Sequence, residues 1–164
     1  KGLAERSIVV ASFGKTFHAT GWKMGYALAP KNLMAEFRKS HQFIVFAVNT
    51  PIQYALAEYI KDENNYKHLN AFYQKKRDYF LELIKASKFK SAPSSGTYFQ
   101  VLDYSEISDL DEMDFAQKLI LENGIASVPV SAFYHNKTDN KMLRFCFAKK
   151  EETLEKAAEL LCKI

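Results

Sequence analysis

Residues 12–26 of this 164-residue chain read SFGKTFHATGWKMGY, and they follow the apolar run Ile8 to Ala11. The run predicts a buried strand, and Lys15 lies in the glycine-bearing loop that comes after it. A lysine held at the mouth of an apolar core loses hydration, which disfavours its charged form and favours its use as a nucleophile. The pattern therefore predicts that Lys15 is desolvated and suited to forming a Schiff base.

The neighbours of Lys15 distinguish it from an ordinary solvated surface lysine. Ser12 lies three residues before it and Lys23 eight residues after it, with glycines at positions 21 and 25. A hydroxyl, a second cation and flexible backbone can bind one anion together. The group predicts a site for a phosphate-bearing ligand.

A P-loop is the competing interpretation of this region, because Gly14-Lys15-Thr16 follows a predicted strand. The P-loop motif has its first glycine five residues before the second, and that position is Val9. A helix should also follow directly, whereas Gly21 and Gly25 interrupt one and Tyr26 to Pro30 reads as a second strand. A nucleoside triphosphate site is therefore disfavoured.

Further motifs follow residues 12–26 in order along nearly the whole chain. They are His41-Gln42, Asn49-Thr50-Pro51, Ser95 to Phe99, Pro129 to Tyr134 and Arg144 to Phe147. Together these motifs resemble the fold-type I aminotransferases that use pyridoxal phosphate, in the kynurenine and methionine aminotransferase branch. The resemblance implies an α/β fold like that of aspartate aminotransferase.

The resemblance also implies roles for matching residues. Lys15 would carry pyridoxal phosphate as a Schiff base and act as the catalytic acid and base. Ser12 and Lys23 would bind the cofactor's phosphate, and Arg144 would bind the substrate's α-carboxylate.

Two further roles come from the same resemblance. In related enzymes the segment that matches Phe46 to Pro51 lies at a dimer interface, so the intact enzyme is expected to be a homodimer in which Asn49 and Thr50 serve the cofactor of the partner subunit. Phe133, with Tyr134 and Tyr98, would line the substrate side. These aromatic residues are equally consistent with a core position.

The activity implied is transfer of an amino group from an amino acid with an apolar or aromatic side chain, such as methionine, kynurenine or phenylalanine, to a 2-keto acid. A hydrophobic pocket discriminates poorly between substrates of similar size, so the donor stays open. A β-lyase acting on cysteine conjugates is an alternative, because it shares the lysine, phosphate and carboxylate sites. A non-catalytic fragment is the other alternative.

Family members are much longer, and their lysine segment lies past the midpoint. We therefore expect residues 1–65 to be the trailing part of the large cofactor-binding α/β domain and residues 66–164 to be a small α+β C-terminal domain. The N-terminal part of such enzymes supplies the carboxylate that holds the pyridine nitrogen protonated. Because the electron-sink chemistry depends on it, we expect the 164 residues alone to be inactive.

The periodicity of the sequence predicts where Arg144 points. Strand alternation over residues 143–147 places Leu143, Phe145 and Phe147 on one face and Arg144 with Cys146 on the other. A guanidinium on a rigid strand suits bidentate carboxylate binding, and a salt bridge to an acidic neighbour is the alternative. Helices are predicted at 31–44, from Thr50 as N-cap with Pro51 first, at 111–123 and at 151–164, and strands at 7–12, 24–29, 97–102 and 125–128.

Composition narrows the partners. The chain has 48% hydrophobic and 26% charged residues and a net charge of +4, with both signs interleaved along predicted helices. Interleaved charge describes solvated faces, so nucleic acid is not expected as a partner, and the apolar runs are too short to span a membrane. Dispersed histidines and cysteines predict no metal site, and a reducing, cytoplasmic location is expected.

Overall fold

The computed structural model describes residues 2–164. The chain divides into two compact units, one ending at His68 and the other running from Leu69 to Ile164. We call them the N-terminal unit and the C-terminal unit and describe each by itself. The boundary drawn from the sequence, between residues 65 and 66, precedes this division by three residues.

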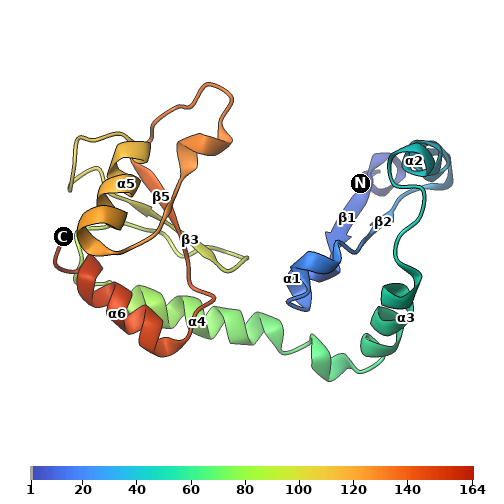
Figure 1. The fold of residues 1–164 in the computed structure, drawn as a ribbon, viewed down its shortest axis with the longest axis horizontal. Coiled ribbons are helices and arrows are strands. Elements are labelled where there is room, and N and C mark those ends of the chain that lie inside the picture. Colours follow the sequence, from blue (N-terminus) through green and yellow to red (C-terminus); the bar gives the residue numbers. More distant parts are fainter. Residues whose placement is uncertain (1) are drawn as a thin grey trace. The chain divides into compact units, whose positions relative to one another are not determined.

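A short antiparallel hairpin organises the N-terminal unit (Figure 1). Strand β1 (Val9–Ser12) pairs with β2 (Gly25–Leu28), from Val9 opposite Leu28 to Ser12 opposite Gly25. The connection holds a single helical turn, α1 (Phe13–Thr16), and a 3-10 turn, η2 (Thr20–Trp22). A second 3-10 turn, η1 (Ala4–Arg6), precedes the hairpin.

Glycine is required at position 25 because the two strands approach closely there. A Cβ atom on Gly25 would lie 2.5 Å from the carbonyl oxygen of Ala11, and backbone cannot give way as a flexible side chain can. At Gly21 a Cβ would meet nothing within 4 Å. The hairpin's pairing at the lysine-bearing end thus depends on one glycine.

Two helices follow the hairpin. The predicted helix at 31–44 is confirmed as α2 (Lys31–Ile44), and α3 (Thr50–Tyr59) precedes the 3-10 turn η3 (Glu63–Asn65). The prediction that Thr50 caps α3 is wrong by one residue. Asn49 is the N-cap, since its side-chain oxygen accepts the N–H of Ile52 at 3.2 Å, and Pro51 is then the second helical residue.

The N-terminal unit has little core of its own. Only Met24 and Leu56 are buried among its hydrophobic residues, whereas Val10 is 73% exposed and Phe43 87% exposed. In α3, Ala55, Tyr59 and Ile60 are exposed as well. A two-stranded ribbon and two helices supply too little surface to cover every apolar stripe.

The C-terminal unit is built on a three-stranded antiparallel sheet. Strands β3 (Phe99–Asp103), β4 (Val128–Pro129) and β5 (Met142–Cys146) are arranged with β5 in the centre. Val101 and Val128 both lie opposite Arg144. Four helical segments complete the unit, namely α4 (Leu69–Leu83), α5 (Glu112–Asn123), the 3-10 turn η4 (Val130–Phe133) and α6 (Glu151–Leu161).

The core of this unit lies between one face of the sheet and the helices (Figure 1). Leu143, Phe145 and Phe147 are buried in it, which confirms the predicted alternation of the last strand. They join apolar residues of α4, α5 and α6, among them Phe80, Ile84, Phe115, Leu119, Leu154, Ala158 and Leu161. Because α4, α5 and α6 all contribute to this one core, the opposite face of the sheet is left free for Arg144.

One predicted strand of this unit is much shorter in the structure. The strand expected at 125–128 is only the pair Val128–Pro129, because Ile125 instead belongs to the buried close of α5, where its N–H donates to the Leu119 carbonyl. Helix α5 itself ends as predicted at Asn123, with Gly124 in the left-handed conformation at φ 68°. Within the described residues, no helix combines the length and apolar character needed to cross a membrane.

Candidate active site

The hairpin brings Ser12 and Lys23 to the same end of the N-terminal unit. Ser12 is the last residue of β1 and the N-cap of α1, and it lies opposite Gly25 in the pairing. The Phe13 N–H donates to the Met24 carbonyl at 3.1 Å, which carries the pairing one step beyond the strands. Lys23, at φ 53°, immediately precedes that step. The pairing of the two strands, rather than closeness in the sequence, therefore brings the Ser12 hydroxyl and Lys23 to the same end of the hairpin.

The turn that carries Lys15 is tied down by its own backbone. The Thr20 hydroxyl donates to the Gly14 carbonyl at 3.2 Å, and the Thr16 hydroxyl donates to the Ser12 carbonyl at 3.4 Å. Gly14 is buried, and a Cβ there would lie 3.1 Å from the Cα atom of Thr20. Lys15 thus extends from a tightly closed single turn that begins at Ser12.

The prediction that Lys15 is desolvated is wrong for this chain. Its side chain is exposed, as is that of Lys23. The physical reason is the small core of the N-terminal unit, which buries only Met24 and Leu56 of its hydrophobic residues. Throughout residues 2–164, no carboxylate forms an ion pair with either lysine, so both cations remain available to an anionic ligand.

Thr50 is not brought to these residues. It begins α3, and α3 meets the lysine-bearing loop through its other end, where the Tyr59 ring contacts Phe17 with centroids 5.1 Å apart. A pocket of about 370 Å³ lies at this contact, lined by Phe17, His18, Ala19, Trp22, Ala55, Leu56 and Tyr59. In the part of the chain that the structure describes, no hydrogen bond joins Thr50 to Ser12, Lys15 or Lys23.

Arg144 lies on the free face of the sheet in the C-terminal unit with two aromatic rings against it. Its guanidinium carbon is 4.1 Å from the Phe99 ring centroid and 4.9 Å from that of Phe133. Its Nε atom is buried and has no hydrogen-bond partner. A buried donor without an acceptor is costly, so this one is suited to an acceptor supplied by a ligand.

The alternative interpretation of Arg144, an ion pair with an acidic neighbour, is not found among residues 2–164. Arginine can donate five hydrogen bonds in a planar fork that matches a carboxylate. With two rings stacked on it and no anion of the chain beside it, the guanidinium keeps that fork unused. The guanidinium is therefore free to bind a carboxylate.

Phe133 contributes to this site by covering Arg144. It is the last residue of η4, its ring is 61% exposed, and its contact is with the guanidinium. Tyr98 lies next to Phe99, with ring centroids 4.5 Å apart, and 5.8 Å from Tyr73. Burial raises the pKa of the Tyr73 phenol, with smaller contributions from Tyr98 and Cys146. The aromatic side chains of Phe99, Tyr98 and Tyr73 therefore form a continuous row from Arg144 to α4.

Two residues of the site escaped the sequence analysis. Phe99 ends a motif in the sequence, but its contact with Arg144 depends on the register between β3 and β5, which local patterns do not reveal. Glu112 is completely buried at 0% exposure and accepts hydrogen bonds from three backbone N–H groups. An acidic residue in the first turn of a helix is usually solvated, so no signal in the sequence marked it.

A metal centre has no support in the described ranges: residues 2–164 contain no group of three or more His, Cys, Asp or Glu side chains able to hold an ion.

Comparison with known proteins identifies relatives over nearly the whole chain. Residues 2–161 match the family model described as aminotransferase class I and II. The methionine aminotransferase of Escherichia coli is 48% identical over 160 residues, which cover 97% of this chain and 42% of that protein. The kynurenine–oxoglutarate transaminase of Dictyostelium discoideum is 34% identical over 185 residues, which cover 99% of this chain and 42% of that protein.

Solved structures agree with these relatives. A crystal structure of an Escherichia coli protein with a methionine aminotransferase function has a TM-score of 0.93 and 46% identity, with 99% of this chain and 43% of that one covered. A mutant of the Thermus thermophilus aspartate aminotransferase has a TM-score of 0.84 at 27% identity, covering 98% of this chain and 41% of that one. The predicted α/β fold of the aspartate aminotransferase kind is confirmed. The chain spans about two fifths of the length of the proteins it matches.

Proposed function

Because this chain belongs to the family of class I and II aminotransferases, we propose that it forms part of an enzyme that moves an amino group from an amino acid to a 2-keto acid. The observation that carries the proposal is Arg144, whose stacked guanidinium has a buried donor and no anion of its own. Both substrates of a transamination carry an α-carboxylate. A single arginine site for that group serves the donor and the acceptor alike.

Pyridoxal phosphate is the cofactor we propose. The residues present suit it, since Ser12 and Lys23 lie at one end of the hairpin and Lys15 extends from the turn that Ser12 caps. A hydroxyl and an ammonium group are good partners for a phosphate, and an amine is the partner for an aldehyde. When bound, this cofactor supplies an electron sink that stabilises negative charge at the substrate's Cα atom.

Lys15 has two tasks in this proposal. It would anchor the cofactor between turnovers, and once freed its amine would accept the proton from the substrate's Cα atom as a base and give it up again as an acid. The single turn α1, closed by the Thr20 and Thr16 hydroxyls, fixes where the amine can reach. The closed turn thus restrains the backbone that carries the lysine.

Arg144 orients the substrate. Its planar fork binds the α-carboxylate through two hydrogen bonds, and the rings of Phe99 and Phe133 restrict the guanidinium and keep water from its faces. Phe133, at 61% exposure, also presents an apolar surface to the substrate's side chain. We therefore propose amino donors with apolar or aromatic side chains, of the methionine or kynurenine kind.

We propose further that the enzyme is a homodimer in which Thr50 serves the partner's cofactor. The support is that Thr50 lies away from Lys15 in its own unit and that the adjoining segment is apolar and open, with Phe46 80% exposed.

A cytoplasmic location is proposed because both cysteines, Cys146 and Cys162, are free, as is usual in a reducing compartment.

The test is borohydride reduction of the cofactor-loaded enzyme, followed by peptide mapping, for the wild type, Lys15→Ala and the matched control Lys31→Ala. We expect one reduced adduct, on Lys15, in the wild type and the control. Lys15→Ala should show no adduct there and no transamination, while the control keeps its rate. Adducts scattered over surface lysines, or turnover by Lys15→Ala, would contradict the assignment. Pyruvate released from a cysteine conjugate without any keto acid would indicate a lyase instead.

A further inference from the structure

Glu112 is a buried acid without a counter-charge. It is 0% exposed, and no lysine, arginine or histidine forms an ion pair with it among residues 2–164. One carboxylate oxygen accepts the N–H groups of Asn140 and Met142, each at 3.0 Å, and the other accepts the N–H of Ser131. Burying a charged group is costly unless hydrogen bonds replace its hydration, and here three backbone donors do so.

The three donors come from the two segments that carry the carboxylate-binding site. Ser131 is two residues before Phe133 in η4, and Met142 is two residues before Arg144 in β5. The Glu112 side chain therefore links the backbone of η4, which carries Phe133, to the backbone of β5, which carries Arg144. The 4.9 Å contact between those two groups depends on how far apart the segments are held.

The anchoring end of Glu112 is itself fixed. It is the first residue of α5, whose N-cap Asp111 accepts the Asp114 N–H at 2.9 Å. Helix α5 is packed into the core through Phe115 and Leu119, which are almost completely buried. The carboxylate is thus held by a rigid element that takes no direct part in the site.

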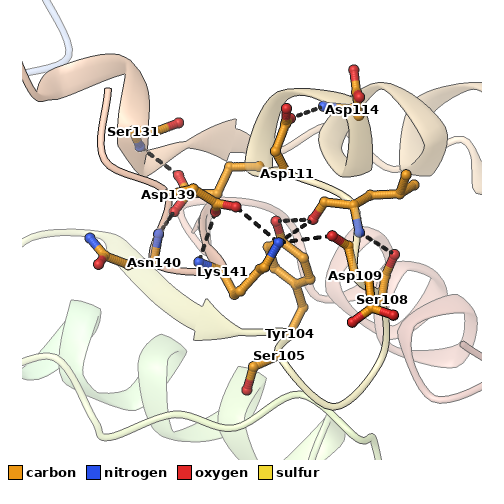
Figure 2. A network of polar contacts seen from close by, with 12 residues as sticks. Tyr104, Ser105, Ser108, Asp109, Asp111, Asp114, Ser131, Asp139, Asn140 and Lys141 are labelled. Atoms are coloured by element: carbon orange, nitrogen blue, oxygen red, sulfur yellow. Dashed lines mark hydrogen bonds and ion pairs between the residues drawn. The ribbon is translucent and has the colours of Figure 1, made fainter. Parts of the chain in front are cut away.

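A second set of contacts closes the loop that connects the two segments (Figure 2). Lys141 donates to the carbonyls of Asp109 and Leu110 at 3.0 and 2.9 Å and pairs with Asp139 at 2.9 Å. The Tyr104 hydroxyl donates to the same Leu110 carbonyl at 3.0 Å. Burial raises the pKa of Tyr104, helped by the nearby negative charges of Asp139, Glu112 and Asp111. These contacts hold the outside of the loop. Its two ends are joined by the backbone pairing of β4 with β5 and, through a side chain, by Glu112.

We propose that Glu112 is a positioning residue for the substrate-carboxylate site, acting through the backbone of Ser131 and Met142 to hold the Phe133 ring against Arg144. The inference rests on the proposed function, because it assumes that Arg144 binds a carboxylate. It adds to that function a buried acid that sets affinity without touching the substrate.

The first test is Glu112→Gln, which keeps the size of the side chain and replaces one acceptor oxygen by an NH₂ group that faces a backbone donor. With the holoenzyme we expect KM for the amino acid to rise about tenfold and kcat to change little, as the loss of a hydrogen bond to a charged group implies. The matched control is Asp114→Asn, the same change on an exposed acid two residues along. Equal KM values for the two variants would overturn the proposal.

A double-mutant cycle separates positioning from general loss of structure. If Glu112 acts through Arg144, Glu112→Gln should lower kcat/KM about tenfold in the wild type and hardly at all in an Arg144→Met background. Additive effects would show that Glu112 only stabilises the fold. Should Glu112→Gln fail to fold, Glu112→Asp keeps the charge but shortens its reach, and it is expected to show the same dependence on Arg144.

Amide hydrogen exchange gives a readout that needs no activity. Exchange at Ser131, Asn140 and Met142 should be about tenfold faster in Glu112→Gln than in Asp114→Asn. A wild-type holoenzyme without transamination would refute the proposed function while these rates still report on Glu112. Unchanged exchange in an active enzyme would refute the role of Glu112 alone.

Discussion

At the scale of single residues, the site depends on charges that the chain leaves unpaired. The amine of Lys15 and the Nε atom of Arg144 have no partner among residues 2–164, and for the buried Nε atom this is unusual. The guanidinium has aromatic contacts instead of a carboxylate. Stacking fixes its plane without neutralising it, which keeps the charge for a ligand.

Arg144→Lys is expected to lower kcat/KM for the amino acid by about 10- to 100-fold, because an ammonium group keeps the charge but loses the two-pronged fork and the stacking on Phe99. Steady-state kinetics with donor and acceptor varied in turn provide the measurement. The same change at exposed Arg38 serves as the control. Equal kinetics for both variants would mean that Arg144 does not bind the carboxylate.

At the scale of elements, the hairpin of β1 and β2 sets the positions of Ser12 and Lys23, and the sheet of β3, β4 and β5 sets those of Phe99 and Arg144. In both cases pairing register decides which side chains become neighbours. A shift by one residue would turn Arg144 into the core and expose Leu143. The elements are therefore part of the binding geometry.

Gly25→Ala tests the hairpin. The new Cβ would meet the Ala11 carbonyl oxygen at 2.5 Å, so we expect a loss of about 1 to 3 kcal/mol in the free energy of unfolding and weaker cofactor binding. Gly21→Ala, which meets nothing within 4 Å, is the control and should behave like the wild type. Denaturant titrations of both variants decide the matter, and equal stability would show that the hairpin relaxes freely.

The loop before β5 has a predictable dependence on pH. Burial alone would raise the pKa of Asp139, but hydrogen bonds and charge from Lys141 outweigh it and hold the pKa below its ordinary value of 3.8. A lowered pKa in the folded protein means that the carboxylate's contribution is complete above the unfolded value, roughly pH 4, and is lost as pH falls through the folded value.

Asp139→Asn should therefore be less stable than the wild type at pH 7, and the difference should shrink as the pH falls through the lowered pKa of the Asp139 carboxyl. Unfolding curves of both proteins between pH 7 and pH 2.5 measure it. A stability difference that stays constant down to the lowest pH would show that the carboxylate's charge plays no part.

At the scale of the whole chain, the two units differ in how much of themselves they can bury. The C-terminal unit has a continuous core that includes Leu102, Tyr104 and Leu143, all at 0% exposure. The N-terminal unit leaves apolar strand and helix faces open, as at Val10 and Phe43. Burial of apolar surface is the main favourable term in folding, so the two units are expected to differ in stability.

Limited proteolysis of the 164-residue chain should therefore cut the N-terminal unit first and leave a fragment close to Leu69–Ile164. Mass spectrometry of the digestion time course identifies the fragments. Early cuts within the C-terminal unit would refute the difference in stability.

We expect no transamination from the 164 residues alone, because the exposed surroundings of Lys15 offer a cofactor few contacts.

Local patterns in the sequence were enough to predict much of this protein. Strand alternation placed Arg144 opposite the apolar residues 143, 145 and 147, and helix periodicity with a terminal glycine ended α5 at Asn123. The order of motifs around Lys15 indicated the family. Such features depend on backbone geometry and on neighbours a few residues away, and for that reason a sequence records them directly.

Only the tertiary structure decided what surrounds these residues. It showed Lys15 exposed, the Phe99 and Phe133 rings against Arg144, and Glu112 buried beneath backbone donors 19 to 30 residues away. Solvent exposure and long-range contacts depend on strand register and on how much chain is present to cover a surface. The residues near a given position do not specify its strand register or how much chain covers it. For this reason the sequence determined which residues are candidates for the site, and the fold determined their environment.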